Sequence, residues 1–140
     1  MFSREITIFN GKLCIKNVML LNEDKTDLII KCFYKVYNKL GYGFLEKVYE
    51  NALIIELRKE GMNCLQQTPV KVYYDEAEIG LYFSDIIVDN EVILELKAGE
   101  GEIIREHESQ LQNYLRATEY EVGIILHFGK KPSFKRKIYT

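Results

Sequence analysis

Apolar residues recur every three or four positions in two stretches of the first half of the chain, which is the spacing of one helix face. The first stretch predicts a helix over residues 27–40, with Thr26 as its cap and Gly41 as its end. The second predicts a helix over residues 45–60 that stops at Gly61. Because only a short connection separates them, the two helices should fold against each other.

The second half of the chain alternates between apolar and polar positions, and this period of two indicates β-strands. A nearly continuous apolar run at residues 122–128 is typical of a strand that is covered on both faces. We expect strands over residues 70–74, 78–82, 84–88, 92–97, 122–128 and 134–139, and a third helix over residues 105–117. This order of elements predicts one layered domain of the α/β or α+β class.

A short segment before these elements predicts a β-hairpin. Asn10-Gly11 separates two apolar stretches within residues 6–15, and Asn-Gly favours a two-residue hairpin turn because both positions need positive φ. We therefore expect an N-terminal hairpin extension over residues 1–23 and a main domain over residues 24–140.

The composition is that of an ordinary globular protein. Of the 140 residues, 47% are hydrophobic and 29% are charged, which argues against a disordered chain. No apolar run approaches the roughly 20 residues of a membrane span, and the first residues lack the layout of a signal peptide. Cys14, Cys32 and Cys64 are too far apart for a CxxC metal site, so we expect buried thiols. These features predict a cytoplasmic protein without membrane attachment.

Charge is unevenly distributed along the chain. The net charge is −2, yet residues 130–140 contain five bases and no acid, so the rest of the chain is more acidic than the total. We call these five bases the basic tail: Lys130, Lys131, Lys135, Arg136 and Lys137. The basic tail is either a solvated edge strand, where lysines discourage aggregation, or a patch that contacts phosphates of a nucleic acid.

Three charged residues in the predicted strands suggest a site. Glu95 and Lys97 lie two apart in an apolar strand and therefore share one face, and Asp85 lies on the preceding strand. A three-residue connection between the strands pairs Asp85 with Glu95, whereas a two-residue turn pairs Asp85 with Leu94 and sends it to the other face. We predict the first register because it separates polar from apolar residues better.

Two opposed carboxylates beside a lysine suit a hard divalent cation, Mg²⁺ or Mn²⁺, which also binds phosphate oxygens. Such an ion polarises a phosphodiester and lowers the pKa of a bound water. Lys97 is placed to orient that water or to neutralise charge on the phosphate. The simpler alternative is an ordinary ion pair between Glu95 and Lys97 on a half-exposed strand.

These residues carry a resemblance. Asp85…Glu95-Leu96-Lys97 resembles the motif of the PD-(D/E)xK nuclease superfamily, with Ser84 in place of the nominal Pro. Gly43-Phe44-Leu45-Glu46-Lys47-Val48-Tyr49 resembles the signature of the GxxExxY protein family, a small prokaryotic branch of that superfamily. The stretch from His107 to Tyr114 resembles the third block of that family and the Q-apolar-x-x-Y element of RecB-like nucleases.

The resemblance implies a restriction-endonuclease-like α/β core, a central mixed sheet flanked by helices, over about residues 24–128. It implies that Asp85, Glu95 and Glu46 bind the metal and that Lys97 is the catalytic lysine. Gln110 and Tyr114 would be auxiliary residues of the same site, although both could equally be ordinary helix surface. We expect His107 to be a solvated or capping residue and His127 to be structural.

The leading hypothesis is a nuclease that depends on Mg²⁺ or Mn²⁺ and hydrolyses DNA or RNA. One alternative is a catalytically silent module that binds nucleic acid or protein; another is a metal-dependent hydrolase of a small phosphorylated ligand. The complete set of catalytic residues favours the first hypothesis. The acidic body favours single-stranded regions or ends over long duplexes, and whether a homodimer or a partner protein forms is left open.

Overall fold

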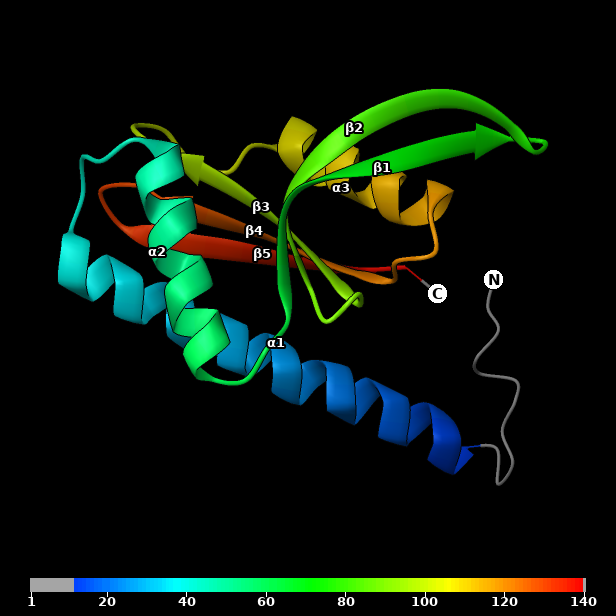
Figure 1. Cartoon of the computed structure of the whole chain (residues 1–140), viewed down its shortest axis with the longest axis horizontal. Helices are drawn as coiled ribbons and strands as arrows, with labels where there is room; N and C mark the ends of the chain where they lie inside the picture. The colour runs from blue at the N-terminus through cyan, green and yellow to red at the C-terminus, as the bar shows by residue number, and fades with distance from the viewer. Residues whose placement is uncertain (1–11, 140) are drawn as a thin grey trace.

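The computed structural model describes the backbone of residues 12–139 and the side chains of residues 23–139. Its helices are α1 (Lys12–Leu40), α2 (Glu46–Lys59) and α3 (Arg105–Ala117), and its strands are β1 (Cys64–Tyr74), β2 (Ala77–Val88), β3 (Val92–Ala98), β4 (Val122–Phe128) and β5 (Pro132–Ile138). The strands form one mixed sheet in the order β1-β2-β3-β4-β5 (Figure 1). Only β3 and β4 run parallel, and α3 connects them, so the predicted α/β class is confirmed.

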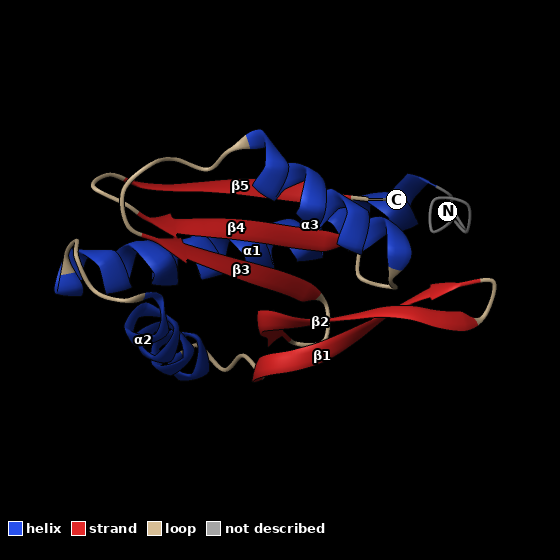
Figure 2. Ribbon diagram, turned by 90° about the horizontal axis from the view of Figure 1, so that it is seen from above, coloured by secondary structure: helices blue, strands red, loops and turns tan. Residues whose placement is uncertain are grey.

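Helices cover both faces of this sheet. α1 and α2 lie on one face, which we call the α1/α2 face, and α3 crosses the other, the α3 face (Figure 2). The larger apolar cluster fills the α1/α2 face, where Phe33 and Leu53 are fully buried against β3 and β4. A smaller cluster on the α3 face joins Leu111 and Leu115 to the odd-numbered strand residues Ile87, Ile93 and Ile125. The central strands are therefore apolar on both sides.

The helix predictions are confirmed except at the start of α1. α2, α3 and the end of α1 agree with the expected ranges, and Gly41 follows α1 with a φ of +74°. Thr26 is not a cap, however, because the helix begins earlier, at Lys12. The Thr26 hydroxyl instead donates to the backbone oxygen of Glu23 (2.9 Å) and accepts from Arg136 on β5 (3.0 Å).

The predicted N-terminal hairpin is wrong for residues 12–15, which belong to α1 rather than to a second strand. The Asn10-Gly11 turn and the rest of the expected first strand lie outside the described residues. An isolated two-stranded hairpin is at best marginally stable, whereas a helix can extend continuously from one that is already packed. The leucines, lysines and methionine between residues 12 and 23 are also good helix formers.

The register between β2 and β3 is the predicted one. Val88 pairs with Val92 and Ile86 with Leu94. Continuing this antiparallel register by one residue places Asp85 opposite Glu95. Only the last residues of β2 pair with β3, and the rest of β2 forms a long hairpin with β1 that projects past the sheet (Figure 1).

β1 begins at Cys64, before the expected start at residue 70, and the expected strands over residues 78–82 and 84–88 are one continuous strand, β2. β5 forms the predicted edge strand, antiparallel to β4. Cys32 and Cys64 are buried free thiols. None of the helices in the described part of the chain has the length and hydropathy of a membrane span.

Candidate active site

Asp85, Glu95 and Lys97 lie on the α3 face, at the point where β2 leaves β3; we call them the carboxylate–lysine cluster. Asp85 is fixed against β3 because its Oδ2 accepts a hydrogen bond from the backbone N–H of Leu96 (2.7 Å). In return, the backbone N–H of Asp85 favours the ionised form of Glu95. The two carboxylates are therefore opposed across neighbouring strands, as the register requires.

The carboxylate of Glu95 lacks part of its hydrogen bonding. Its Oε2 is buried and has no hydrogen-bond partner. Burial raises the pKa of the Glu95 carboxyl to about 8, the charge of Asp85 adds to the rise, and Lys97 opposes it. A buried oxygen without a donor is uncommon in folded proteins and calls for an explanation such as a bound ion or a functional role.

Two neighbouring acids, Asp85 and Glu46, also have raised pKa values. Burial raises the pKa of Asp85, and the hydrogen bonds that it accepts from Leu96 and Gln67 lower it only in part. Burial and the charge of Asp85 raise the pKa of Glu46, which Lys97 lowers. Lys97 is thus the shared countercharge of all three acids, and one ammonium group does not neutralise them.

Glu46 is the first residue of α2, and Tyr49 stabilises the loop that precedes this helix. The Tyr49 hydroxyl donates to the backbone oxygen of Gly41 (2.5 Å) and accepts from the backbone N–H of Phe44 (3.2 Å), which fixes the loop before α2. Its ring is fully buried and stacks on Phe128 with centroids 4.1 Å apart. Glu46 itself is exposed, and the backbone N–H of Ala98 at the end of β3 favours its ionised form.

Two residues that the sequence analysis did not assign to the site lie beside Asp85. Glu50 is only 3% exposed and pairs with Lys47 (Nζ–Oε2 3.1 Å). It also accepts hydrogen bonds from the amides of Gln66 (2.8 Å) and Gln67 (3.1 Å), and the Gln67 amide reaches Asp85 Oδ1 as well (3.3 Å). Glu50 lies four residues after Glu46, on the same side of a helix, and this spacing is a signal that could have found it. No sequence signal indicated Gln67.

α3 brings its predicted residues to the same place. The Gln110 amide donates to the Tyr114 hydroxyl (2.8 Å), and both side chains line a small cavity together with Glu95 and Lys97. The Tyr114 ring stacks on Tyr82 of β2 with centroids 3.6 Å apart. The buried Tyr82 hydroxyl has no partner, and burial and the nearby charge of Glu95 raise its pKa. The sequence analysis missed Tyr82.

Both histidines are placed as expected. His107 Nδ1 accepts a hydrogen bond from the backbone N–H of Ile104 (3.4 Å) at the start of α3, and burial followed by the charge of Lys97 lowers its pKa. His127 is buried at the end of β4, with Nε2 3.2 Å from the backbone oxygen of Gly99. A Cβ on Gly129 would come within 2.6 Å of the His127 ring, so the chain packs tightly around it.

The structure distributes the basic tail over both faces of β5 and the preceding turn. Arg136 points to the α1/α2 face, where it donates to Thr26, and Lys137 pairs with Glu108 of α3 (Nζ–Oε1 2.6 Å). Lys135 lies in the row Glu95–Ile125–Lys135 and therefore shares the α3 face with the cluster, two strands or roughly 10 Å from Glu95.

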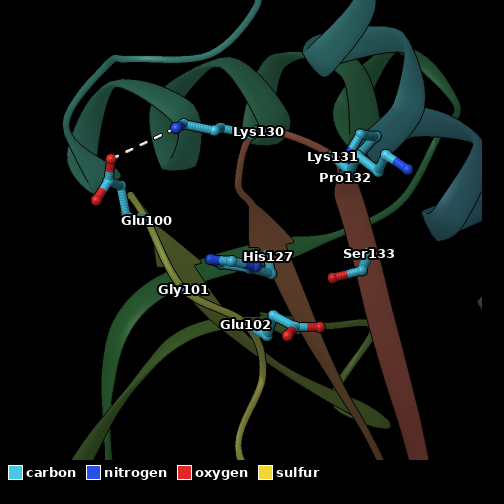
Figure 3. Close-up of a pocket in the computed structure, with 8 residues that line it drawn as sticks. All are labelled: Glu100, Gly101, Glu102, His127, Lys130, Lys131, Pro132 and Ser133. Carbon is cyan, nitrogen blue, oxygen red and sulfur yellow. Dashed lines mark ion pairs between the residues drawn. The ribbon is translucent and has the colours of Figure 1, made fainter.

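A pocket lies at the ends of β3 and β4, beside the cluster (Figure 3). It is lined by Glu100, Gly101, Glu102, His127, Lys130, Lys131, Pro132 and Ser133. The register row Lys97–His127–Ser133 connects it to the cluster across the sheet. Lys130 is held by Glu100 (Nζ–Oε1 3.6 Å), so the pocket has charges of both signs rather than a purely basic surface.

The predicted three-carboxylate metal set is not assembled. Among the described side chains, no three His, Cys, Asp or Glu residues converge closely enough to hold an ion by themselves. Asp85 and Glu95 still fit Mg²⁺ or Mn²⁺, since Mg²⁺ commonly takes one or two carboxylates and completes its coordination with water and phosphate oxygens. The unpartnered Glu95 Oε2 is the observation that favours such an ion.

Comparisons with known proteins gave a family match and a structural neighbour. The family described as the PD-(D/E)XK nuclease superfamily matches residues 23–137. A search of curated proteins gave no match. Among solved structures, the crystal structure of SSO0001 aligns with a TM-score of 0.47 and 17% identity, covering 66% of this chain and 50% of that chain. The chain thus spans about half the length of that protein.

Proposed function

The chain belongs to the PD-(D/E)XK nuclease superfamily, and from this premise we propose that it is a Mg²⁺- or Mn²⁺-dependent nuclease that hydrolyses phosphodiester bonds of DNA or RNA. The observation that carries the proposal is the carboxylate–lysine cluster with its buried, unpartnered Glu95 oxygen. A structural ion pair would place the Lys97 ammonium on the Glu95 carboxylate, and the buried Oε2 has no such partner.

Asp85 and Glu95 would hold the ion, which when bound supplies Lewis-acid polarisation of the phosphate and a water of lowered pKa. Lys97 contributes a fixed positive charge next to both carboxylates, where it can stabilise the negative charge that builds up on the phosphate. Glu46 adds a further acceptor at the open side of the site, and we propose that it binds the ion indirectly, through water.

Gln110 and Tyr114 are proposed to position the substrate. Their side chains already form a hydrogen-bonded pair beside Glu95 and Lys97, so both are oriented before substrate binds. The Tyr114 ring is further fixed by its stack on Tyr82. A preorganised pair of this kind lowers the entropic cost of orienting a phosphodiester.

We further propose that the substrate is a single strand or a free end and that Lys135 contacts its backbone. The acidic body disfavours long duplexes. Lys135 and Lys137 share the α3 face with the cluster, but Lys137 is paired with Glu108, whereas Lys135 lies in the register row of Glu95. From Gly43, Glu46 and Tyr49 we propose that the chain belongs to the GxxExxY branch and has a RecB-like Q-x-x-x-Y helix. From its buried thiols we propose that it is cytoplasmic.

The test is cleavage of labelled single-stranded and duplex DNA and RNA by the purified chain with Mn²⁺. Lys97→Ala should lower the rate by about 10²–10³-fold, as for the loss of one positioned electrostatic group. Lys71→Ala is the matched control, since Lys71 pairs with Glu78 on the projecting hairpin. Equal rates for the wild type and Lys97→Ala would refute the nuclease proposal.

A silent binding module is the second candidate, and the absence of a three-side-chain metal set among the described residues is what favours it. On that hypothesis the chain binds a labelled single strand without cleaving it, and neither Mn²⁺ nor Lys97→Ala changes the affinity.

A further inference from the structure

The backbone of β1 is strained at one position, Gln67. Its φ of 48° lies in the left-handed region, which glycine adopts freely and residues with a Cβ avoid. The other non-glycine residues with positive φ in the described chain form the two tight turns at residues 75–76 and 89–90. Gln67 is therefore the one such residue inside a strand, and the position would be less strained with glycine.

The strain coincides with the row of Asp85. The β1–β2 ladder pairs residue 66 with 86 and residue 68 with 84, and it skips the row that joins Gln67 to Asp85. The Gln67 side chain is exposed and belongs to neither apolar cluster, so core packing does not explain why glutamine occupies this position. Its contacts with Glu50 and Asp85 are what the side chain adds.

We propose that Gln67 is a positioning residue of the active site, whose amide orients the Asp85 carboxylate for a divalent cation and separates it from Glu50. The proposal rests on the proposed metal-dependent function, which it deepens by adding a residue that supports a metal ligand. Backbone strain that serves an active-site arrangement is a recognised feature of enzymes.

The chemistry of the amide suits this role. One –NH₂ group carries two hydrogens, and here it lies within 3.1 Å of Glu50 Oε1 and 3.3 Å of Asp85 Oδ1. Leu96 N–H holds Oδ2 from the opposite strand, so each oxygen of Asp85 has one donor and keeps a free acceptor position. Without the amide, Asp85 Oδ1 would lose its donor, and Leu96 N–H alone would hold the carboxylate.

The first experiment measures Mn²⁺ affinity by isothermal titration calorimetry, which needs no catalytic activity. Gln67→Ala should weaken binding about 10–100-fold, the usual effect of removing a group that orients a metal ligand. Gln66→Ala is the matched control, because Gln66 contacts Glu50 and Asn51 but not Asp85, and it should leave the affinity within about twofold.

A second variant separates positioning from backbone strain. Gln67→Gly relieves the positive φ and removes the amide, so it should raise the Tm of the metal-free protein and still weaken Mn²⁺ binding. A glycine variant that binds Mn²⁺ as tightly as the wild type would overturn the proposal.

A metal-free double-mutant cycle tests the contact even if the wild type binds no Mn²⁺. In EDTA, Gln67→Ala should lower the Tm more when residue 85 is Asp than in the Asp85→Asn background, because a hydrogen bond to a charged carboxylate is stronger than one to a neutral amide oxygen. Equal Tm changes in both backgrounds would overturn the role of Gln67, whereas absent Mn²⁺ binding with an unequal cycle would count against the metal-dependent function alone.

Discussion

Two glutamates, the buried Glu56 and the half-buried Glu95, have opposite electrostatic environments on the two sides of the molecule. Glu56, on α2 next to α1, lies within 3.1–3.7 Å of three lysine ammonium groups, and these hold the pKa of its carboxyl below the ordinary value. Glu95, on the α3 face, has one oxygen without any partner and a pKa raised to about 8. The same fold thus satisfies one carboxylate fully and leaves the other unsatisfied.

The apolar layers show the same contrast. On the α1/α2 face, the even-numbered residues of β3 and β4 and the end of β2 from Ile86 form an apolar surface under Phe33, Tyr49 and Leu53. The buried Ser84, whose hydroxyl has no partner, precedes this surface on β2. On the α3 face the apolar cluster stops where β2 leaves β3, and the carboxylate–lysine cluster follows. Charged groups that share one countercharge in an otherwise consistent fold are expected at functional sites, which is the reason to look for a function at the carboxylate–lysine cluster.

The largest expected effect breaks the well-packed side. Phe128 is fully buried and contacts the rings of Phe33 (4.8 Å) and Tyr49 (4.1 Å). Phe128→Ala should lower the free energy of unfolding by about 3–5 kcal/mol, the usual cost of such a cavity. Urea unfolding followed by circular dichroism measures it, and a loss below 1 kcal/mol would mean that this face is not the main core.

The two glutamates should respond in opposite directions to the same substitution. In metal-free protein near pH 8, Glu95→Gln should stabilise the fold by about 1–2 kcal/mol, since it removes a charge that burial disfavours. Glu56→Gln should destabilise it by about 1 kcal/mol, because exposed lysines lose one shared partner. Thermal unfolding of both variants in EDTA measures the difference, and equal signs would contradict the contrast.

The pH dependence of the wild type sharpens the comparison. An acid whose pKa rises from 4.5 in the unfolded chain to about 8 in the fold favours folding below pH 4.5, and this advantage disappears as the pH rises to 8. The metal-free Tm should therefore fall by about 3–8 °C between about pH 6.5 and pH 9. The lowered pKa of His107 acts in the opposite direction only below its ordinary value of 6.5.

Two controls test the assignment of this pH effect to Glu95. Glu95→Gln should flatten the change in Tm, and saturating Mg²⁺ should do the same by stabilising the ionised carboxylate. Differential scanning fluorimetry across the pH series measures both, and an unchanged slope in Glu95→Gln would assign the effect to another group.

The smallest expected effect distinguishes the two faces of β5. Lys135→Ala should reduce the dependence of single-strand binding on salt by about 0.7 in the log–log slope, the contribution of one phosphate contact. Arg136→Ala, on the opposite face and bonded to Thr26, should leave the slope unchanged. Fluorescence anisotropy with a labelled oligonucleotide measures both, and identical slopes for the two variants would leave edge protection as the role of the basic tail.

Local patterns alone predicted much of this molecule. The apolar periodicities located α2, α3 and β4, because a segment with one buried face must repeat with the period of its backbone. The β2–β3 register followed from the separation of polar and apolar positions, since a slip of one residue would have moved every side chain to the wrong face. The opposed Asp85 and Glu95 were therefore predictable before any tertiary contact was known.

Other features depended on contacts between residues distant in the sequence. The start of α1 at Lys12 depended on which of two locally favoured structures could extend a packed element, and residues 12–15 continue the helix instead of forming the predicted second strand of a hairpin. Gln67 joined the site only through a strand distortion, and Tyr82 only through its stack on Tyr114. The raised pKa of Glu95 likewise required burial in the packed fold and the charge of Asp85 on the neighbouring strand, because burial and neighbouring charge are properties of the packed fold and are not encoded in any single segment.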